Sequence, residues 1–322
     1  MKSVIKRKEV CFFALFFLLI ISIYLSLFIG RYNGIMFSDE WKTVVANIRL
    51  PRILLSCMVG GALSVSGTVY QSVFHNPMAS PDMLGASSSA ALGAALGILL
   101  RFSSFGICMI SFAFGLLGVL VVYLAGKALR GDDFISLILS GMVISSLFGS
   151  GTSFIKLCAD PSDQLPAITY WLMGSFNNTD YRDVIIMLIP FVIGTLVLFV
   201  IGGKLNLLLL SDEEAMSMGV NVKIYRLIFI ICATLLTASS VCVGGIIGWV
   251  GLIVPNILRG LFGNNSRFLI IMSVFAGGLF LLIIDDLSRS LFTGEIPLGI
   301  LTSIIGTPLF FMILRKGMHL YE

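Results

Sequence analysis

Charged side chains are scarce in this chain. Of its 322 residues only 12% are Asp, Glu, Lys or Arg, whereas 57% are hydrophobic and the mean hydropathy is +1.03. Because about a quarter of the residues of soluble domains are charged, this composition excludes an ordinary soluble domain. It indicates a polytopic membrane protein.

Residues that build metal and catalytic sites are also few. His75 and His319 are isolated in the sequence, and the six cysteines show neither a CxxC pair nor the spacing of metal ligands. Asp285 and Asp286 are the nearest approach to a catalytic carboxylate pair, and they have no further catalytic residues close to them in the sequence. We therefore predict no catalytic residue, no metal site and no cofactor, which argues against a membrane-embedded enzyme. The cysteines are expected to act as small apolar core residues.

A phosphate-binding loop is missing as well. Neither of the two Gly-Lys pairs, at 126–127 and 203–204, is followed by Ser or Thr, and neither has the earlier glycine of the GxxxxGK[ST] pattern. Any ATP hydrolysis must therefore take place on another chain.

Ionisable residues within apolar stretches are the mark of ion-driven carriers, and they are rare here. Lys156 lies near the end of one apolar stretch, and Asp285 and Asp286 lie late in another. Arg289 follows Asp285 by four residues, so one helical face can pair the two. We interpret this as a structural ion pair rather than a proton relay. An ion-coupled secondary carrier is the alternative to a pump that draws on ATP.

Long apolar runs dominate the sequence. The first follows a basic N-terminus, as in a signal peptide, but its length of about 20 residues suits a full span, and no small-x-small cleavage site follows it. Ten such runs predict ten spans, with both termini on the cytoplasmic side. Lys and Arg are more frequent in the loops on that side, which supports this orientation. The predicted spans are residues 10–30, 53–74, 84–100, 105–125, 134–155, 184–201, 227–243, 249–258, 268–284 and 296–314.

The seventh and eighth spans come from one uncharged stretch, residues 227–258. One helix would leave Arg226 and Arg259 on opposite sides of the membrane, and two full helices of about 20 residues each do not fit. Gly244-Gly245 and Pro255 favour a break followed by a short helix, with irregular backbone that other helices must cover.

Small residues crowd the second and third spans. Gly60, Gly61 and Gly67 lie in the second, and the third carries Gly93-x-x-x-Gly97. Such faces let membrane helices approach closely, so we expect a tightly packed bundle.

A polar segment, SDEEAMSMGVNV (residues 211–222), interrupts the apolar pattern. Ser211 and Glu214 have the spacing of a capping box, with acidic residues in the first turn, where the helix dipole favours them. Gly219 supplies a left-handed C-terminal cap. The segment predicts a short helix between two spans, which is either a solvated turn or a docking helix for a soluble partner.

Several motifs occur together in one order. They are RLPR (49–52), GGALSVSGTVYQSVFHNPMASPDMLG (60–85), WLMGSF (171–176), the polar segment ending in MGV (218–220), GWVGLIVPN (248–256), EIPLG (295–299) and GTP (306–308). With these motifs the sequence resembles the FecCD family, the permease subunits of ABC importers for iron–siderophores, haem and cobalamin. It departs from the family at Asn256, where histidine is common.

The resemblance implies an all-α, polytopic membrane protein with ten transmembrane helices and the type II ABC importer permease fold, in which residues 1–322 form a single transmembrane permease domain. It implies a second permease subunit, in a homodimer or a heterodimer, two cytoplasmic ABC ATPases and an extracytoplasmic substrate-binding protein. The expected cargo is a metal chelate, with an iron–siderophore as the first choice and haem or cobalamin as alternatives. Membrane lipid is an expected partner and nucleic acid is not. The expected location is the bacterial plasma membrane.

The resemblance also assigns roles to residues. The predicted coupling helix for the ATPase comprises Ser211, Asp212, Glu213, Glu214, Ala215, Met216, Ser217, Met218, Gly219 and Val220. Asn76 and Met78 are predicted to narrow the cytoplasmic mouth of the pathway, or alternatively to form only a rigid turn.

Three arginines complete the assigned sites. Arg49, Arg52 and Arg289 are expected at the outer end, where the family uses arginines to meet glutamates of the binding protein. Because Pro51 suits the first turn of a helix, the guanidinium groups of Arg49 and Arg52 are expected to project outward. As alternatives, Arg49 and Arg52 bind lipid phosphates, and Arg289 is occupied by Asp285.

Overall fold

The structure of the protein, a computed structural model, describes residues 2–30, 38–129, 133–291 and 294–318. Over these residues all of its regular secondary structure is helical. The elements are α1 (Lys2–Ser26), α2 (Asp39–Val44), η1 (Val45–Arg49), α3 (Leu50–Val73), η2 (Pro81–Leu84), α4 (Ala86–Leu99), α5 (Ser104–Ala128), α6 (Asp133–Cys158), α7 (Gln164–Leu172), α8 (Tyr181–Leu207), α9 (Asp212–Ser217), α10 (Val222–Gly244), α11 (Val250–Phe262), α12 (Ser266–Ser290) and α13 (Leu298–Met318).

The helices that can cross a membrane match the predicted stretches. Within the described residues, seven are long and apolar enough to span a bilayer, and the shorter apolar helices Ala86–Leu99, Val250–Phe262 and Leu298–Ile313 occupy the remaining three stretches. The fold is thus that of a polytopic, all-helical membrane protein, as predicted.

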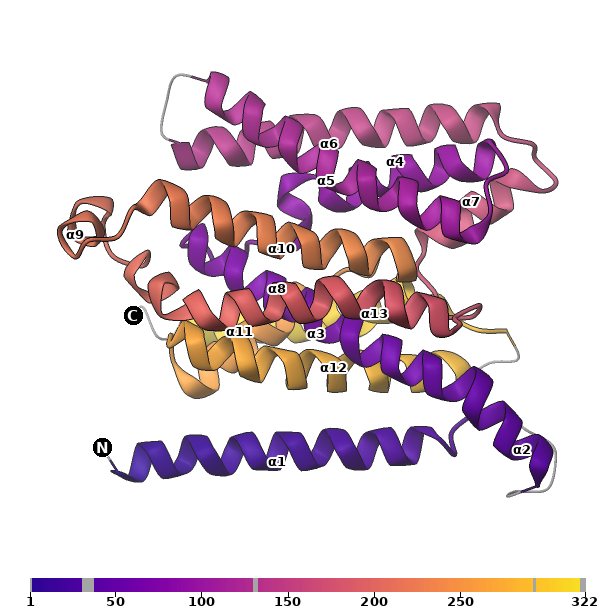
Figure 1. Cartoon of the computed structure of the whole chain (residues 1–322), viewed down its shortest axis with the longest axis horizontal. Coiled ribbons are helices and arrows are strands. Elements are labelled where there is room, and N and C mark those ends of the chain that lie inside the picture. The colour runs from indigo at the N-terminus through magenta and orange to yellow at the C-terminus, as the bar shows by residue number, and fades with distance from the viewer. Residues whose placement is uncertain (1, 31–37, 130–132, 292–293, 319–322) are drawn as a thin grey trace.

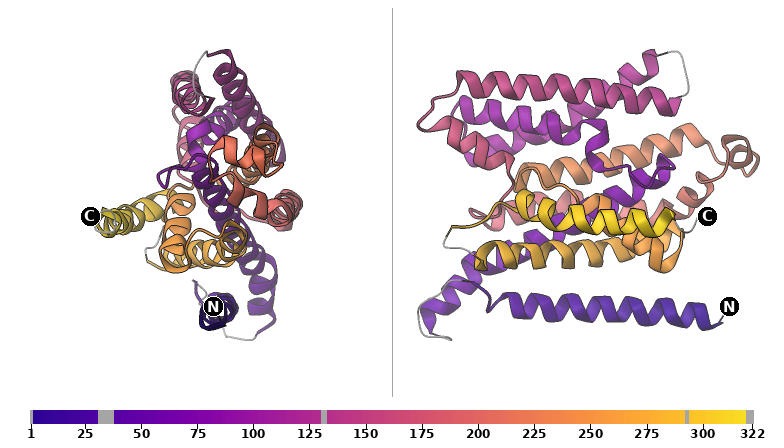
Figure 2. Two further views of the ribbon diagram at one scale, coloured as in Figure 1. Left: turned by 90° about the vertical axis from the view of Figure 1, so that its left-hand side faces the viewer. Right: turned by 180° about the vertical axis from the view of Figure 1, so that it is seen from behind.

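The long helices lie side by side with α3 among them, α1 along one edge and α6 along the other (Figure 1). The start of α1, the end of α13 and α9 lie at one end of the bundle, whereas α2 and α7 lie at the opposite end, and the view from behind shows the same arrangement (Figure 2). This arrangement agrees with an even number of membrane crossings.

Close backbone contacts hold the bundle together, as the small residues predicted. A Cβ atom on Gly60 of α3 would overlap the carbonyl oxygen of Gly277 on α12, and one on Gly277 would overlap that of Gly60. Gly67 lies in the same way against Gly251 of α11. Since lipid provides no hydrophobic drive for helix association, such close packing is a main source of stability.

The predicted break between the seventh and eighth spans is confirmed. Helix α10 ends at Gly244, Gly245 has a φ of +69°, and α11 starts at Val250. The end of α7 and the turn that follows it cover Gly245, which lies against the backbone of Trp171 and Gly174, and irregular backbone at membrane depth requires such cover.

The second span begins earlier than predicted. Pro51 lies in the first turn of α3, as predicted. However, α3 continues a helical segment that begins at Asp39, so Pro51 does not lie at the start of the whole segment. The π-helical turn Val45–Arg49 precedes the proline, and such a turn accommodates a residue that lacks a backbone N–H. The arginines beside Pro51 therefore lie inside a longer helix.

Candidate functional site

The predicted polar helix forms α9. Ser211 Oγ accepts a hydrogen bond from Glu214 N at 3.3 Å, and Glu214 Oε2 accepts one from Ser211 N at 3.1 Å. Gly219, with a φ of +77°, ends the helix in the left-handed conformation. Both predicted caps are confirmed.

One side of α9 rests on the bundle and the other side is open. Ala215 and Val220 are buried, whereas Met216 and Met218 are 57% and 58% exposed. Asp212 Oδ1 lies 3.1 Å from Arg226 Nη2, which connects α9 to the start of α10. The helix is therefore fixed in place and presents carboxylates together with two flexible apolar side chains.

A tight turn follows α3 at the same end of the bundle. Asn76 Oδ1 accepts a hydrogen bond from Met78 N at 2.8 Å, and the side chain of Met78 is 54% exposed. Asn256 of α11 donates from Nδ2 to the carbonyl oxygen of Pro77 at 2.8 Å. The residue that departs from the family pattern thus connects α11 to this turn.

The three predicted arginines gather at the opposite end, but they do not project outward. Arg49, Arg52 and Arg289 are only 5%, 5% and 7% exposed. The expected outward direction of Arg49 and Arg52 is therefore wrong, because these residues lie within the longer helix and face α1 and α12. Arg49 Nη1 donates to the carbonyl oxygen of Leu27.

Arg52 is the centre of this cluster. Its Nη2 lies 2.8 Å from Asp285 Oδ1, its Nε lies 3.0 Å from both carboxylate oxygens of Asp285, and its Nη1 lies 2.8 Å from Glu295 Oε1. The Asp285 side chain is fully buried, and that of Glu295 is 24% exposed. Such charge-assisted bonds in a planar, forked arrangement are among the stronger polar contacts.

Arg289 completes the cluster through a different partner from the one predicted. It forms an ion pair with Asp286 Oδ1, which also accepts a hydrogen bond from Ser26 Oγ at 2.6 Å. The predicted pair with Asp285 is present but longer, with Arg289 Nε 3.8 Å from Asp285 Oδ2. Both carboxylates are therefore bound to arginines, which supports a structural role over a proton relay.

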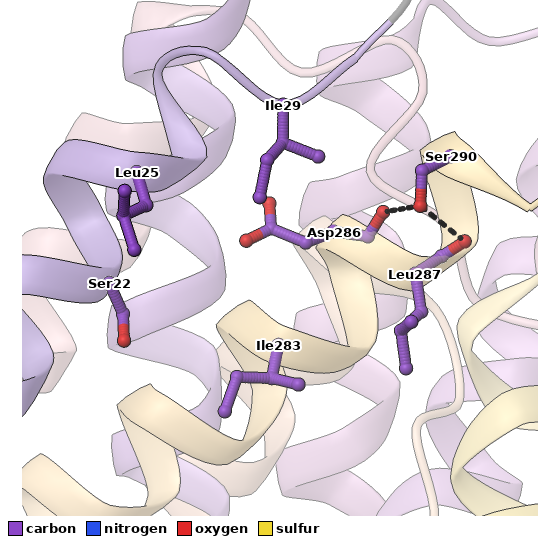
Figure 3. Close-up of a pocket in the computed structure, with 7 residues that line it drawn as sticks. All are labelled: Ser22, Leu25, Ile29, Ile283, Asp286, Leu287 and Ser290. Atoms are coloured by element: carbon purple, nitrogen blue, oxygen red, sulfur yellow. Dashed lines mark hydrogen bonds between the residues drawn. The ribbon is translucent and has the colours of Figure 1, made fainter.

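A cavity of about 280 Å³ lies beside this cluster, between α1 and α12. Its walls are mostly apolar, and Asp286 lies between Ile29 and Ser290 (Figure 3). It is smaller than the pockets of roughly 300–1,000 Å³ that hold drug-sized ligands. This cavity therefore does not suit a large chelate.

Sequence reasoning missed several of these residues. Glu295 and Asn256 lay within recognised motifs without an assigned contact, and Ser26 lay in an apolar run. The i,i+3 spacing of Asp286 and Arg289 was available as a signal, because it permits pairing as well as i,i+4 does.

Comparison with known proteins agrees with this architecture. The FecCD transport family profile matches residues 18–316. The molybdate import permease MolB of Haemophilus influenzae is 34% identical over 94% of this chain and 95% of its own length, and the hemin transport permease HmuU of Yersinia pestis is 34% identical over 93% and 95%. A structure described as an inward-facing metal-chelate type ABC transporter superposes with a TM-score of 0.90, at 36% identity, over 96% of this chain and 99% of its own. The chain therefore belongs to the FecCD transport family.

Proposed function

We propose that this chain is the permease subunit of an ABC importer that takes up a metal chelate, with an iron–siderophore as cargo. The observation that carries the proposal is the close match over nearly the whole chain to a metal-chelate type transporter. The absence of a phosphate-binding loop supports ATP hydrolysis on a separate subunit. Haem and cobalamin are the alternative chelates.

Uptake by the reconstituted transporter tests the cargo. Proteoliposomes with the complete complex and its binding protein are expected to accumulate a radioactive ferric siderophore, and only when ATP is inside. Haemin, cobalamin and molybdate are the comparison cargoes, the last because one relative is a molybdate permease. ATP-driven uptake of one of these three, without uptake of any ferric siderophore, would refute the iron–siderophore assignment.

The partners are assigned to the two ends of the bundle. We place a cytoplasmic ATPase at residues 211–220, because α9 offers exposed carboxylates and exposed methionines next to buried anchoring residues. Two such ATPases would serve a permease dimer, made of two copies of this chain or of this chain and a related one. Residues 1–322 act as a single transmembrane domain in this assembly.

The proposed orientation places α9 and both termini in the cytoplasm of a bacterium, with the chain in its plasma membrane. Its support is the bias of Lys and Arg toward that side and the position of α9 at the same end as the start of α1 and the end of α13 (Figure 1). The turn at Asn76 and Met78 then lies at the cytoplasmic mouth, where we place the gate.

The outer end is the proposed docking surface for the binding protein, with Arg49, Arg52 and Arg289 as its cations. The structure limits how they act, because Arg52 and Arg289 already form ion pairs with carboxylates of this chain. Arg49 forms no ion pair with a carboxylate among the described residues. Of the three arginines, it is therefore the one whose charge no carboxylate of the described residues already pairs with, and a partner's carboxylate would reach it only if its side chain, now 5% exposed, moved outward from Leu27.

Reversing the charge of Arg49 tests this surface. Arg49→Glu is expected to slow association of the binding protein and to weaken its dependence on salt, because charges at an interface mainly steer encounter. The measurement is surface-based binding at low and high salt. Lys42→Glu is the control, because Lys42 is exposed near the same end and already pairs with Asp39. If Arg49→Glu and Lys42→Glu change association equally, Arg49 has no specific docking role.

A further inference from the structure

The turn between α3 and η2 is held at two points, and one of them leads to α9. On one side, Asn256 of α11 binds the carbonyl oxygen of Pro77. On the other side, His75 Nε2 lies 2.5 Å from the carbonyl oxygen of Leu208, at the end of α8. The carbonyl can only accept, so Nε2 is the donor.

The contact at Leu208 has a physical basis on both sides. The last carbonyl groups of a helix have no partner within the helix, and His75 supplies one for the end of α8. The backbone of His75 has a φ of +45°, which is uncommon for a residue other than glycine. His75 therefore combines a positive φ with the contact to Leu208, and Asn76 follows it directly in the chain.

The connection from Leu208 to α9 is short. Leu209 N and Leu210 N donate to the carbonyl oxygens of Asn206 and Leu207, so this segment is a tight turn. Ser211, the N-terminal cap of α9, follows directly. Because the segment is short and hydrogen-bonded, a displacement of α9 is expected to move the carbonyl group of Leu208 as well.

We infer that His75 is a positioning residue that transmits movement of α9 to the turn at Asn76 and Met78. This inference rests on the proposed function, in which α9 receives the ATPase and the turn forms the gate. The His75–Leu208 hydrogen bond is the link: the turn follows α9 through His75, while Asn256 holds its other side against α11.

Two amide substitutions separate the side-chain link from the backbone conformation. The amide nitrogen of Gln can reach the position of Nε2, whereas that of Asn is one methylene shorter. Asn, however, adopts positive φ more readily than most residues. If the side chain provides the link, His75→Gln is expected to keep the transmission from α9 to the turn and His75→Asn is expected to lose it. If only the backbone conformation of His75 matters, the reverse order is expected.

The readout is cross-linking between the two permease subunits at an introduced Met78→Cys, in the complex with its ATPase, with and without ATP. Met78 suits this purpose because its side chain is exposed. The complex without the introduced cysteine controls for the native cysteines. In the His75→Asn background the ATP-dependent change in cross-linking is expected to fall about tenfold, within the range of typical coupling between sites. In the His75→Gln background it is expected to stay near that of the parent. Both His75 variants are expected to retain the ATPase, with basal hydrolysis equal to that of the parent that carries Met78→Cys.

The outcomes distinguish the inference from the function on which it rests. An unchanged response in His75→Asn, or a response lower in His75→Gln than in His75→Asn, would overturn the link while leaving the gate intact. Absence of any ATP-dependent cross-linking in the parent, or of any ATPase in the purified complex, would overturn the proposed gate or docking role, and the inference with it.

Discussion

Asp285→Ala is expected to lower the free energy of unfolding by about 3–5 kcal/mol, the usual effect of removing one partner of a buried ion pair. The Asp285 side chain is fully buried and is bound by Arg52, whose own side chain is 7% exposed. Without the carboxylate, the guanidinium group keeps only Glu295 as an ion-pair partner among the described residues. The measurement is denaturant-induced unfolding in detergent, followed by tryptophan fluorescence.

Removing both charges is the control for this prediction. The double variant Arg52→Leu with Asp285→Leu is expected to recover most of the lost stability, because apolar residues of similar volume often replace a buried ion pair without loss. Glu295 is partly exposed, so water can solvate its carboxylate after Arg52 is removed. If Asp285→Ala unfolds at the same denaturant concentration as the parent, the ion pair does not stabilise the subunit.

Local chemistry explains why much of the fold was predictable. The ten apolar stretches, the capping box of Ser211 and Glu214 and the break at Gly245 all depend on residues close together in sequence. The start of the second span was not predictable in the same way. The helix continues past Pro51 because a π-helical turn precedes it, and no residue pattern in that segment signals such a turn.

The polar contacts were harder to predict because they join distant parts of the chain. Arg52 is 233 residues from Asp285 and 243 from Glu295, and one sequence without an alignment gives no information on such pairs. The closer partner of Arg289 was difficult to predict for a different reason. Asp286 (i,i+3) and Asp285 (i,i+4) both lie on the same helical face as Arg289, so the spacing does not distinguish them. The burial of the arginines could not be predicted, because their partners in the structure could not be predicted.

Gly219→Val is expected to lower ATP-driven uptake roughly 5- to 150-fold, which corresponds to a backbone strain of about 1–3 kcal/mol. Gly219 has a φ of +77°, and no atom lies within 4 Å of the position that a Cβ would occupy. The penalty therefore arises from the backbone of the cap and not from a clash. A valine at this position is expected to displace Met218 and the end of α9 from the proposed ATPase surface, and the measurement is uptake per inserted transporter together with ATPase co-purification.

Gly263→Val is the matched control for Gly219→Val. Gly263 ends α11 with a φ of +76° and a ψ of −166°, a conformation that is essentially confined to glycine. It also has no atom within 4 Å of the Cβ position, so valine is strained there at least as much, without any change to α9. Gly219→Asn is the second control, because Asn tolerates the left-handed conformation. Gly263→Val and Gly219→Asn are both expected to keep ATPase co-purification and most of the uptake. An equal loss of uptake in Gly219→Val and Gly263→Val would mean that strain at any helix end impairs the transporter. The result would then give no support to a specific role of α9 in coupling.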